Sequence, residues 1–471
     1  MNGMVWRYIM LADRRTVQFI IGMAAIVSLV SAGTYYNQLI PLVGGMAILV
    51  IGAVSIRFPI AMLVLYAAML PFDDINIPGI GSLTRGAGIV FTACYLLTRL
   101  KKIKLQIIPL PVWLFFGWAL CSVIWALDQH TASSTVKMYI QQFLMIVLIA
   151  NAIHEQPKAL PWMMLFYTCS AVITSGLAVE KFLTNSSAAS IRVQAFENQD
   201  EAHFAGVLLP ALLFCVYQFM QTRARSYKIL FFLMMMIVSL AVLASGTRSA
   251  WLGIALSLLF VIIPKLDRKK MMALLAISLL LGMIAINIPS LSAFITSRSS
   301  DAVSSGGSGR TSIWQVGLTI FQQQPVFGVG IGNFPKSFTK EMIDRTMLVS
   351  PDITYQGEGR VAHNIYLSSV VEYGVIGLMF FLLILFQLLR RGSHPYWNMI
   401  QSIGISYITM GFFLDLGNRK YFWFILAVAI GLQSLSKRTK DSKELEKSEQ
   451  THTLADSSLP FRNKPVGRRF S

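Results

Sequence analysis

Charged residues are scarce in this chain. Only 13% of its 471 residues are charged and 55% are hydrophobic, whereas a soluble globular protein carries roughly 25% charged residues. Long apolar runs account for the deficit, for example residues 19–30, 229–244 and 375–389. Each run lies in a window that approaches the roughly 20 apolar residues needed to cross a bilayer. The composition therefore argues against a soluble enzyme and predicts a polytopic membrane protein.

Cysteine and the motifs of common soluble enzymes are scarce as well. The four cysteines lie inside apolar stretches without paired spacing, so we interpret them as small buried residues rather than disulfides or metal ligands. The chain has no GxxxxGK[ST], no HExxH and no GxSxG at a strand-to-helix turn. No His/Cys cluster has the spacing of metal ligands. The sequence therefore predicts no metal and no cofactor.

The chain is strongly basic, with a formal net charge of +18. On a soluble protein this charge would suggest a nucleic-acid partner. In a membrane protein, however, lysine and arginine collect in the cytoplasmic loops and set the topology. We therefore expect the lipid bilayer, and no nucleic acid, as a partner.

Hydropathy predicts about 14 membrane spans. Their approximate limits are residues 16–35, 38–56, 58–72, 87–100, 107–127, 134–152, 159–180, 203–220, 228–244, 248–264, 271–289, 364–390, 396–415 and 419–436. With the N-terminus inside, nearly every basic cluster falls in an inside loop, as the positive-inside rule requires. The outer side then receives residues 71–86, 128–133, 181–202, 245–248 and 290–363.

This topology predicts an all-α transmembrane bundle of about 12–14 helices. Residues 1–289 would hold the first eleven spans, 290–363 a large extracytoplasmic loop with short helices, 364–436 the C-terminal spans, and 437–471 a disordered basic cytoplasmic tail. A loop this long is uncommon unless it is functional. Its glycine-rich segment PVFGVGIGNF, residues 325–334, is interpreted as a tight turn that positions the loop on the bundle.

Four arginines lie on the outer side, which the positive-inside rule leaves poor in positive charge: Arg85, Arg192, Arg248 and Arg310. Arg248 is placed at the start of a helix, where free N–H groups favour anions, and its planar guanidinium suits phosphate. Each arginine alone could be a solvated charge, and Arg248 could reach lipid headgroups. Together they predict a site for a diphosphate.

His363 opens the segment HNIYLSSVVEYGVIGL, at the end of the long loop or in the first turn of the next helix. A helix N-terminus disfavours imidazolium, so we expect a lowered pKa and a neutral ring that can act as a general base. The alternative is a capping or interfacial histidine. At 100° per residue, Leu367, Val370, Gly374 and Gly377 share the His363 face of this helix, and the two glycines let another helix pack closely beneath the histidine. Glu372 would point away, toward a neighbouring helix or a cavity.

These motifs resemble those of the O-antigen ligase and O-antigen polymerase superfamily of bacterial envelope glycosyltransferases. The resemblance covers about residues 245–380 and is carried by SGTRSAWLG, by SGRTSIW with PVFGVGIGNF, and above all by AHNIYLSSVVEYGVIGL. The loop around Asn198 is similar to the family's Arg…Pro-Asn segment, but Gln and Asp replace the usual neighbours. The resemblance implies a GT-C-like bundle in the bacterial cytoplasmic membrane, with its active site on the extracytoplasmic face.

The resemblance also implies inverting transfer of a glycan from undecaprenyl diphosphate to lipid A core or to another lipid-linked repeat, without a nucleotide sugar or a metal. His363 would assist the acceptor hydroxyl, and Arg248 would hold the diphosphate. The other implied binding residues are Arg310, Arg192, Arg85, Asn198, Asn364 and Glu372. Other envelope polysaccharide assembly proteins are possible partners.

Two alternatives stay open at this point. A transporter or flippase of lipid-linked oligosaccharide should show internal repeats or midplane ionisable residues, and no clear repeat is evident. The choice between ligase and polymerase is not decided by the residues.

Overall fold

The computed structural model describes residues 59–77, 81–184, 192–196, 199–259, 310–349, 359–390 and 392–436, with isolated positions between 267 and 287. Several predicted features lie outside the described residues. These are the spans at 16–35 and 38–56, most of the span at 271–289, the tail 437–471, and Asn198.

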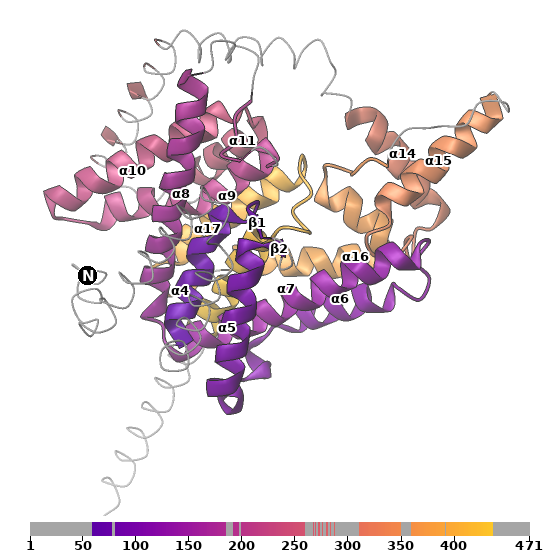
Figure 1. Cartoon of the computed structure of the whole chain (residues 1–471), viewed down its shortest axis with the longest axis horizontal. Coiled ribbons are helices and arrows are strands. Elements are labelled where there is room, and N and C mark those ends of the chain that lie inside the picture. Colours follow the sequence, from indigo (N-terminus) through magenta and orange to yellow (C-terminus); the bar gives the residue numbers. More distant parts are fainter. Residues whose placement is uncertain are drawn as a thin grey trace, which may run out of the picture.

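The described part is almost entirely helical (Figure 1). After α4 (Pro59–Met69) and η1 (Leu70–Phe72), a short antiparallel hairpin of β1 (Asn76–Ile77) and β2 (Gly81–Ser82) leads into α5 (Leu83–Arg99). The next elements are η2 (Leu100–Lys102), η3 (Leu105–Ile107), α6 (Leu110–Cys121), α7 (Gln129–Glu155), α8 (Ala159–Thr184), α9 (Glu201–Gln221), α10 (Arg225–Ala244) and α11 (Arg248–Ser257). The remaining helices are α14 (Arg310–Gln323), α15 (Phe334–Val349), α16 (Ile365–Leu389), α17 (Trp397–Gly411) and the last helix, Lys420–Ser436.

Five of these helices, α7, α8, α9, α10 and α16, are long and apolar enough to cross a membrane. Large apolar side chains face outward from them, for example Ile173 and Phe386, which are both 57% exposed. Such a surface is unfavourable in water but suits contact with lipid tails. The protein is an all-α polytopic membrane protein, and the predicted fold class is confirmed.

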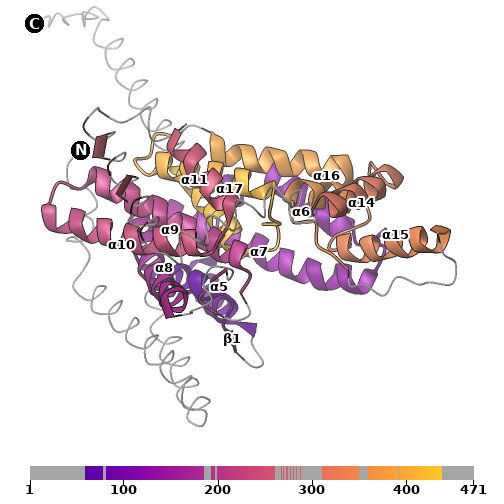
Figure 2. The same cartoon turned by 90° about the horizontal axis from the view of Figure 1, so that it is seen from above.

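The last helix, Lys420–Ser436, forms the centre of the bundle (Figure 2). Every residue from Phe422 to Ile430 is at most 2% exposed. A helix that is apolar on all sides is one that other elements surround. The Phe424 ring packs against Tyr66 of α4 and Tyr167 of α8, with ring centroids 6.3 and 6.0 Å apart. This helix therefore fixes the positions of the spans around it.

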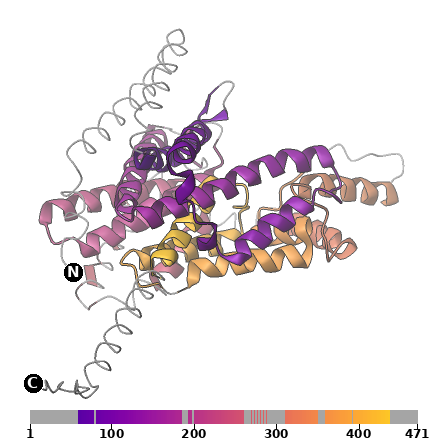
Figure 3. The ribbon, with the colours of Figure 1, turned by 90° about the horizontal axis from the view of Figure 1, so that it is seen from below.

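The helices α14 and α15 pack beside α16 at one end of the molecule (Figure 1). They share a second apolar cluster with α16, which includes Ile313, Phe334 and Leu367. From below, the purple helix α6 lies alongside the orange helix α16 (Figure 3). The described end of the long loop is thus docked on the bundle by hydrophobic contacts.

Helix α16 is broken at Gly374, where φ is +66° and ψ is −173°. The carbonyls of Val371 and Glu372 accept hydrogen bonds from the N–H groups of Val329 and Gly330, both at 2.9 Å. The expected unbroken helical face from His363 to Gly377 is therefore wrong. The physical reason is that the carbonyls at the break bond to the loop 325–334 instead of to the next helical turn.

Candidate active site

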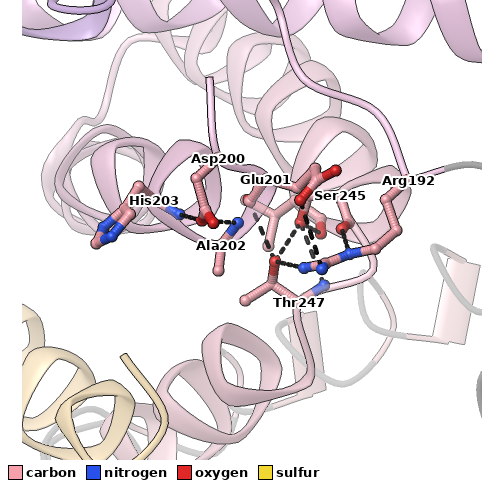
Figure 4. Close-up of polar contacts among 8 residues, drawn as sticks. Arg192, Asp200, Glu201, Ala202, His203, Ser245 and Thr247 are labelled. Atoms are coloured by element: carbon pink, nitrogen blue, oxygen red, sulfur yellow. Dashed lines mark hydrogen bonds and ion pairs between the residues drawn. The ribbon is translucent and has the colours of Figure 1, made fainter. Parts of the chain in front are cut away.

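Arg192 fastens the loop before α9 to the turn before α11 (Figure 4). Its Nε donates a hydrogen bond to the Ser245 carbonyl at 3.1 Å, and its Nη2 donates to Thr247 Oγ1 at 3.4 Å. Its Nη1 forms an ion pair with Glu201 Oε2 at 3.4 Å. All three guanidinium nitrogens therefore have protein partners, so Arg192 stabilises this junction and adds its charge to the region.

Asp200 caps α9 and lies within range of the charges of Arg192 and Arg419. Its Oδ1 accepts hydrogen bonds from the N–H groups of Ala202 and His203, both at 2.9 Å, which satisfies donors that a helix start leaves unpaired. Burial alone would raise the pKa of Asp200. The neighbouring His203 and the backbone donors, followed by Arg419 and Arg192, outweigh burial and lower this pKa. The ionised carboxylate therefore offsets part of the local positive charge.

Arg248 and Arg310 each begin a helix, α11 and α14. The Arg248 side chain is exposed, whereas Arg310 is half-buried. Burial lowers the pKa of Arg310, and the positive charges of Arg192 and Arg248 lower it further, while Asp200 opposes them. Charges act on each other strongly only at short range. Three arginines that are far apart in the sequence therefore share one region, and two helix N-termini add to its positive potential.

His363 lies just before α16 in the left-handed backbone region, with φ of +48°. Such a conformation is uncommon for a residue other than glycine and is often found at functional sites. Burial lowers the pKa of His363, and the charge of Arg310 lowers it further, while Asp200 and Asp415 act in the opposite direction. The expected lowering is confirmed, but its main causes are burial and an arginine rather than the helix N-terminus.

Helix α14 begins at Arg310 and also binds the backbone next to His363. Trp314, one helical turn after Arg310, donates a hydrogen bond from Nε1 to the Ala362 carbonyl at 3.0 Å. The helices α14 and α16 approach closely at Gly317, where a Cβ would lie 3.0 Å from Leu367 Cδ2. Arg310 and His363 are therefore positioned by one element. Trp314 was not predicted as a site residue, because a tryptophan in an amphipathic helix is expected to pack in the hydrophobic core.

The backbone of the glycine loop (residues 325–334), between α14 and α15, is hydrogen-bonded along most of its length. Every backbone N–H from Gly328 to Phe334 has an acceptor. Gly328, Gly330 and Gly332 have φ values of +73°, +92° and +71°, and a Cβ at Gly330 would lie 2.5 Å from Ala126 Cα. Only glycine combines these dihedral angles with such close contact. The predicted tight turn is confirmed.

Glu372 binds this glycine loop. The side chain is only 8% exposed, and its Oε2 and Oε1 accept hydrogen bonds from the N–H groups of Gly332 and Phe334 at 2.9 and 3.2 Å. It also lines a cavity of about 10 Å³ with Ser369 and Asp415. The partner that a buried carboxylate requires is thus the loop backbone, and Glu372 has a positioning role.

The turn between α17 and the last helix supplies two residues that the sequence analysis missed. Asp415 accepts hydrogen bonds from Ser368 Oγ at 3.1 Å and from the Gly417 N–H at 3.0 Å, and its charge acts on His363. The charge of Arg419 acts on Asp200. The available signal was the dense charge of DLGNRK, residues 415–420, in a short turn between two apolar spans.

The remaining candidates are placed differently. Asn364 is the N-cap of α16, and its Oδ1 accepts from the N–H groups of Tyr366 and Leu367, both at 3.0 Å. Arg85 lies in the first turn of α5, at the mouth of a separate cavity. In the described structure no contact joins Arg85 to the other arginines. Asn198 lies outside the described residues.

The arrangement combines a histidine of lowered pKa with three fixed positive charges. A neutral imidazole can accept a proton, and fixed guanidinium groups can stabilise a leaving group that becomes negative. Among the residues that the structure describes, no group of three or more His, Cys, Asp or Glu is placed to hold a metal ion. A base and an anion-binding region in one part of the bundle are therefore chemically feasible with these residues.

The chain was compared with known protein families. Residues 233–382 match the family model described as O-antigen ligase. This segment contains Arg248, Arg310, His363 and Glu372, whereas Arg192 and the last two helices lie outside it. The match confirms the resemblance found in the sequence motifs. No curated protein matches the chain.

Proposed function

We propose that the chain is a member of the O-antigen ligase and polymerase superfamily, because residues 233–382 match its O-antigen ligase model. As such a member, it transfers a glycan from undecaprenyl diphosphate to an acceptor sugar. The family match itself gives a ligase- or polymerase-type activity in polysaccharide biosynthesis. The donor carrier, the inverting course and the extracytoplasmic face of the bacterial cytoplasmic membrane are parts of the proposal.

One observation carries the proposal most directly. Arg192 and Arg248 both act on Arg310, and Arg310 acts on His363. A glycan carried on a lipid diphosphate has a doubly phosphorylated leaving group, which needs positive charge as the glycosidic bond breaks. Guanidinium groups supply this charge and bind phosphate through paired hydrogen bonds. The same region contains a histidine that is neutral at physiological pH.

The proposed reaction is a single displacement. The acceptor hydroxyl attacks the anomeric carbon, and a new C–O bond forms as the C–O bond to the diphosphate breaks on the opposite face. The configuration at the anomeric carbon is thereby inverted. The imidazole of His363 takes the hydroxyl proton, and the electron pair of the broken bond leaves on the diphosphate, which Arg248 and Arg310 stabilise.

The test is glycan transfer by the purified full chain with an undecaprenyl-diphosphate glycan as donor. We expect His363→Ala to slow transfer by about 10²–10⁴-fold, the usual contribution of a general base. We expect Arg248→Ala to slow it by about 10²–10³-fold, as for loss of one charge-stabilising donor. Lipid A core and a second lipid-linked repeat, offered as acceptors in parallel, separate ligase from polymerase activity.

Matched controls are available for both substitutions. His130→Ala removes an exposed histidine from the first turn of α7. Lys336→Gln removes a positive charge from a side chain in the same long loop that is 61% exposed. Both controls should transfer like the wild type. If His363→Ala and Arg248→Ala also did so, the proposed site would be wrong.

A further inference from the structure

A second cavity, which Arg192, Arg248 and Arg310 do not line, lies between α5, α7 and the last helix. Its volume is about 290 Å³, near the lower end of the roughly 300–1,000 Å³ that is typical of ligand pockets. Its deeper walls are apolar and include Tyr66, Met145, Ile149 and Phe424. Methionine adapts readily to a flexible apolar ligand. The volume and the apolar lining therefore suit a hydrocarbon chain.

The cavity opens sideways between α5 and α7. Ile89 is 56% exposed, and the neighbouring wall residues Ala93 and Gln141 are also exposed. Helix α7 is apolar enough to cross a membrane, and the exposed wall residues of α5, Ile89 and Ala93, are apolar, so this opening suits lipid tails better than water. A chain longer than the cavity could enter it and continue into the bilayer.

The outer mouth of the cavity carries positive charge. Lys420 and Arg85 line it. Lys420 Nζ is held by Asp73 Oδ1 and by Ser82 Oγ, both at 2.6 Å. For the exposed guanidinium of Arg85, no ion pair is seen with any residue that the structure describes. Arg85 is therefore placed to bind an anion at the point where the apolar groove reaches the membrane surface.

Gln142 indicates that the ligand has a polar group inside the cavity. It is 5% exposed and lines the cavity. Neither its Nε2 nor its Oε1 has a hydrogen-bond partner within the described part of the chain. A buried amide without partners is costly, so an oxygen-bearing ligand in the cavity would relieve this cost. Charge at the mouth, an unpaired amide inside and apolar walls together describe an amphiphile with one chain and an anionic head.

We infer that this groove holds the isoprenoid chain of a lipid-linked acceptor, with the acceptor's diphosphate at Arg85. This inference rests on the proposed function. The donor's diphosphate is the leaving group and must lie at the arginines beside His363. Arg85 stands apart from them, so it suits a diphosphate that stays intact during transfer. A cavity of about 290 Å³ also suits part of one polyprenyl chain better than the several acyl chains of lipid A.

The groove and the active site both lie next to the turn at the start of the last helix. Lys420, at the mouth, follows Arg419, whose charge acts on Asp200. A glycan that rises from the mouth would therefore pass this turn before its sugar reaches His363. The placement favours a polymerase, in which both substrates are lipid-linked, over a ligase.

The test uses a substitution that fills the groove from its lipid side. Ala93→Trp places a large ring in the cavity wall, and Leu97→Trp, on the same helix at a position 78% exposed, is the matched control. Transfer is measured with the full chain in nanodiscs, using a repeat unit on undecaprenyl diphosphate or on geranyl diphosphate as acceptor. We expect Ala93→Trp to raise the KM for the undecaprenyl acceptor about tenfold, which corresponds to about 1.4 kcal/mol of binding free energy.

The KM for the donor should stay unchanged in Ala93→Trp, and the preference for the long-chain acceptor should disappear. Arg85→Gln should raise the acceptor KM for both chain lengths, and Arg85→Lys should restore part of the loss. A change in the donor KM instead, or no difference between Ala93→Trp and Leu97→Trp, would overturn the assignment. In both of these cases the wild type would still transfer glycan, so the proposed function would stand. If the wild type transferred no glycan, the proposed function itself would be refuted.

Discussion

Glu372 provides a direct test of how the active site is held together. Its two carboxylate oxygens accept hydrogen bonds from the N–H groups of Gly332 and Phe334 at 2.9 and 3.2 Å. Glu372→Gln keeps the size of the side chain but leaves only one oxygen as an acceptor. The new amide NH₂ would face the second backbone N–H, so two donors would meet in a buried place.

The size of the effect follows from these two bonds. A buried donor that loses its acceptor costs about 1–3 kcal/mol. A neutral amide is less costly to bury than a carboxylate, and this difference offsets part of the loss. We therefore expect the free energy of unfolding to fall by about 1–2 kcal/mol. Glycan transfer should fall as well, because the glycine loop continues directly from α14, which carries Arg310.

Thermal unfolding of the purified chain can be followed by tryptophan fluorescence. Trp118 is a suitable reporter, since its Nε1 donates a hydrogen bond to the Tyr373 carbonyl at 2.8 Å, beside the break in α16. Ser369→Ala is the matched control, because Ser369 lines the same small cavity as Glu372 while the loop N–H groups bond elsewhere. If Glu372→Gln unfolded and transferred like Ser369→Ala, the loop would not depend on this carboxylate.

Three further predictions concern His363, the turn that carries it and the glycine loop. The rate of transfer should rise with pH through the pKa of His363, which lies below its ordinary 6.5, and level off near neutrality. Arg310→Gln removes a charge that lowers this pKa, so it should move the rise to higher pH. An unchanged pH profile would contradict the proposed base. Trp314→Phe removes the hydrogen bond to the Ala362 carbonyl and should lower kcat more than it changes KM. The free energy of unfolding should fall by about 1 kcal/mol. If the variant had the kcat and KM of the wild type, this bond would not position the turn that carries His363. Gly330→Ala adds a Cβ in the left-handed region, which costs about 1–2 kcal/mol before any clash. The variant should give less monodisperse protein in size-exclusion chromatography. A wild-type yield would contradict the requirement for glycine at this position of the loop.

The sequence was sufficient to predict the bundle. The spans expected at 159–180, 203–220 and 228–244 correspond closely to α8 (Ala159–Thr184), α9 (Glu201–Gln221) and α10 (Arg225–Ala244). Long apolar runs determine these helices almost alone, because a membrane helix must be apolar over most of its length. The same patterns could not show that the short last helix lies at the centre, since hydropathy reports the composition of a segment and not its neighbours.

The site was predicted in part, for a similar reason. Loop topology placed Arg192, Arg248, Arg310 and His363 on one side, and the structure brings these four together. The helical wheel failed at Gly374, because a wheel assumes that every carbonyl bonds within its own helix. Here two carbonyls bond to the glycine loop instead, and a contact between segments about 40 residues apart has no periodic signal.

The three arginines of the site are in different environments, and this difference sets what each can contribute. The guanidinium of Arg192 already donates to Ser245 and Thr247 and pairs with Glu201. It can therefore add positive potential, but a diphosphate would have to replace its protein partners to bind it directly. Arg248 is exposed at the first position of α11, where the positive end of the helix dipole also favours an anion. Direct binding of the leaving group should thus depend more on Arg248, and the integrity of the junction between α9 and α11 more on Arg192.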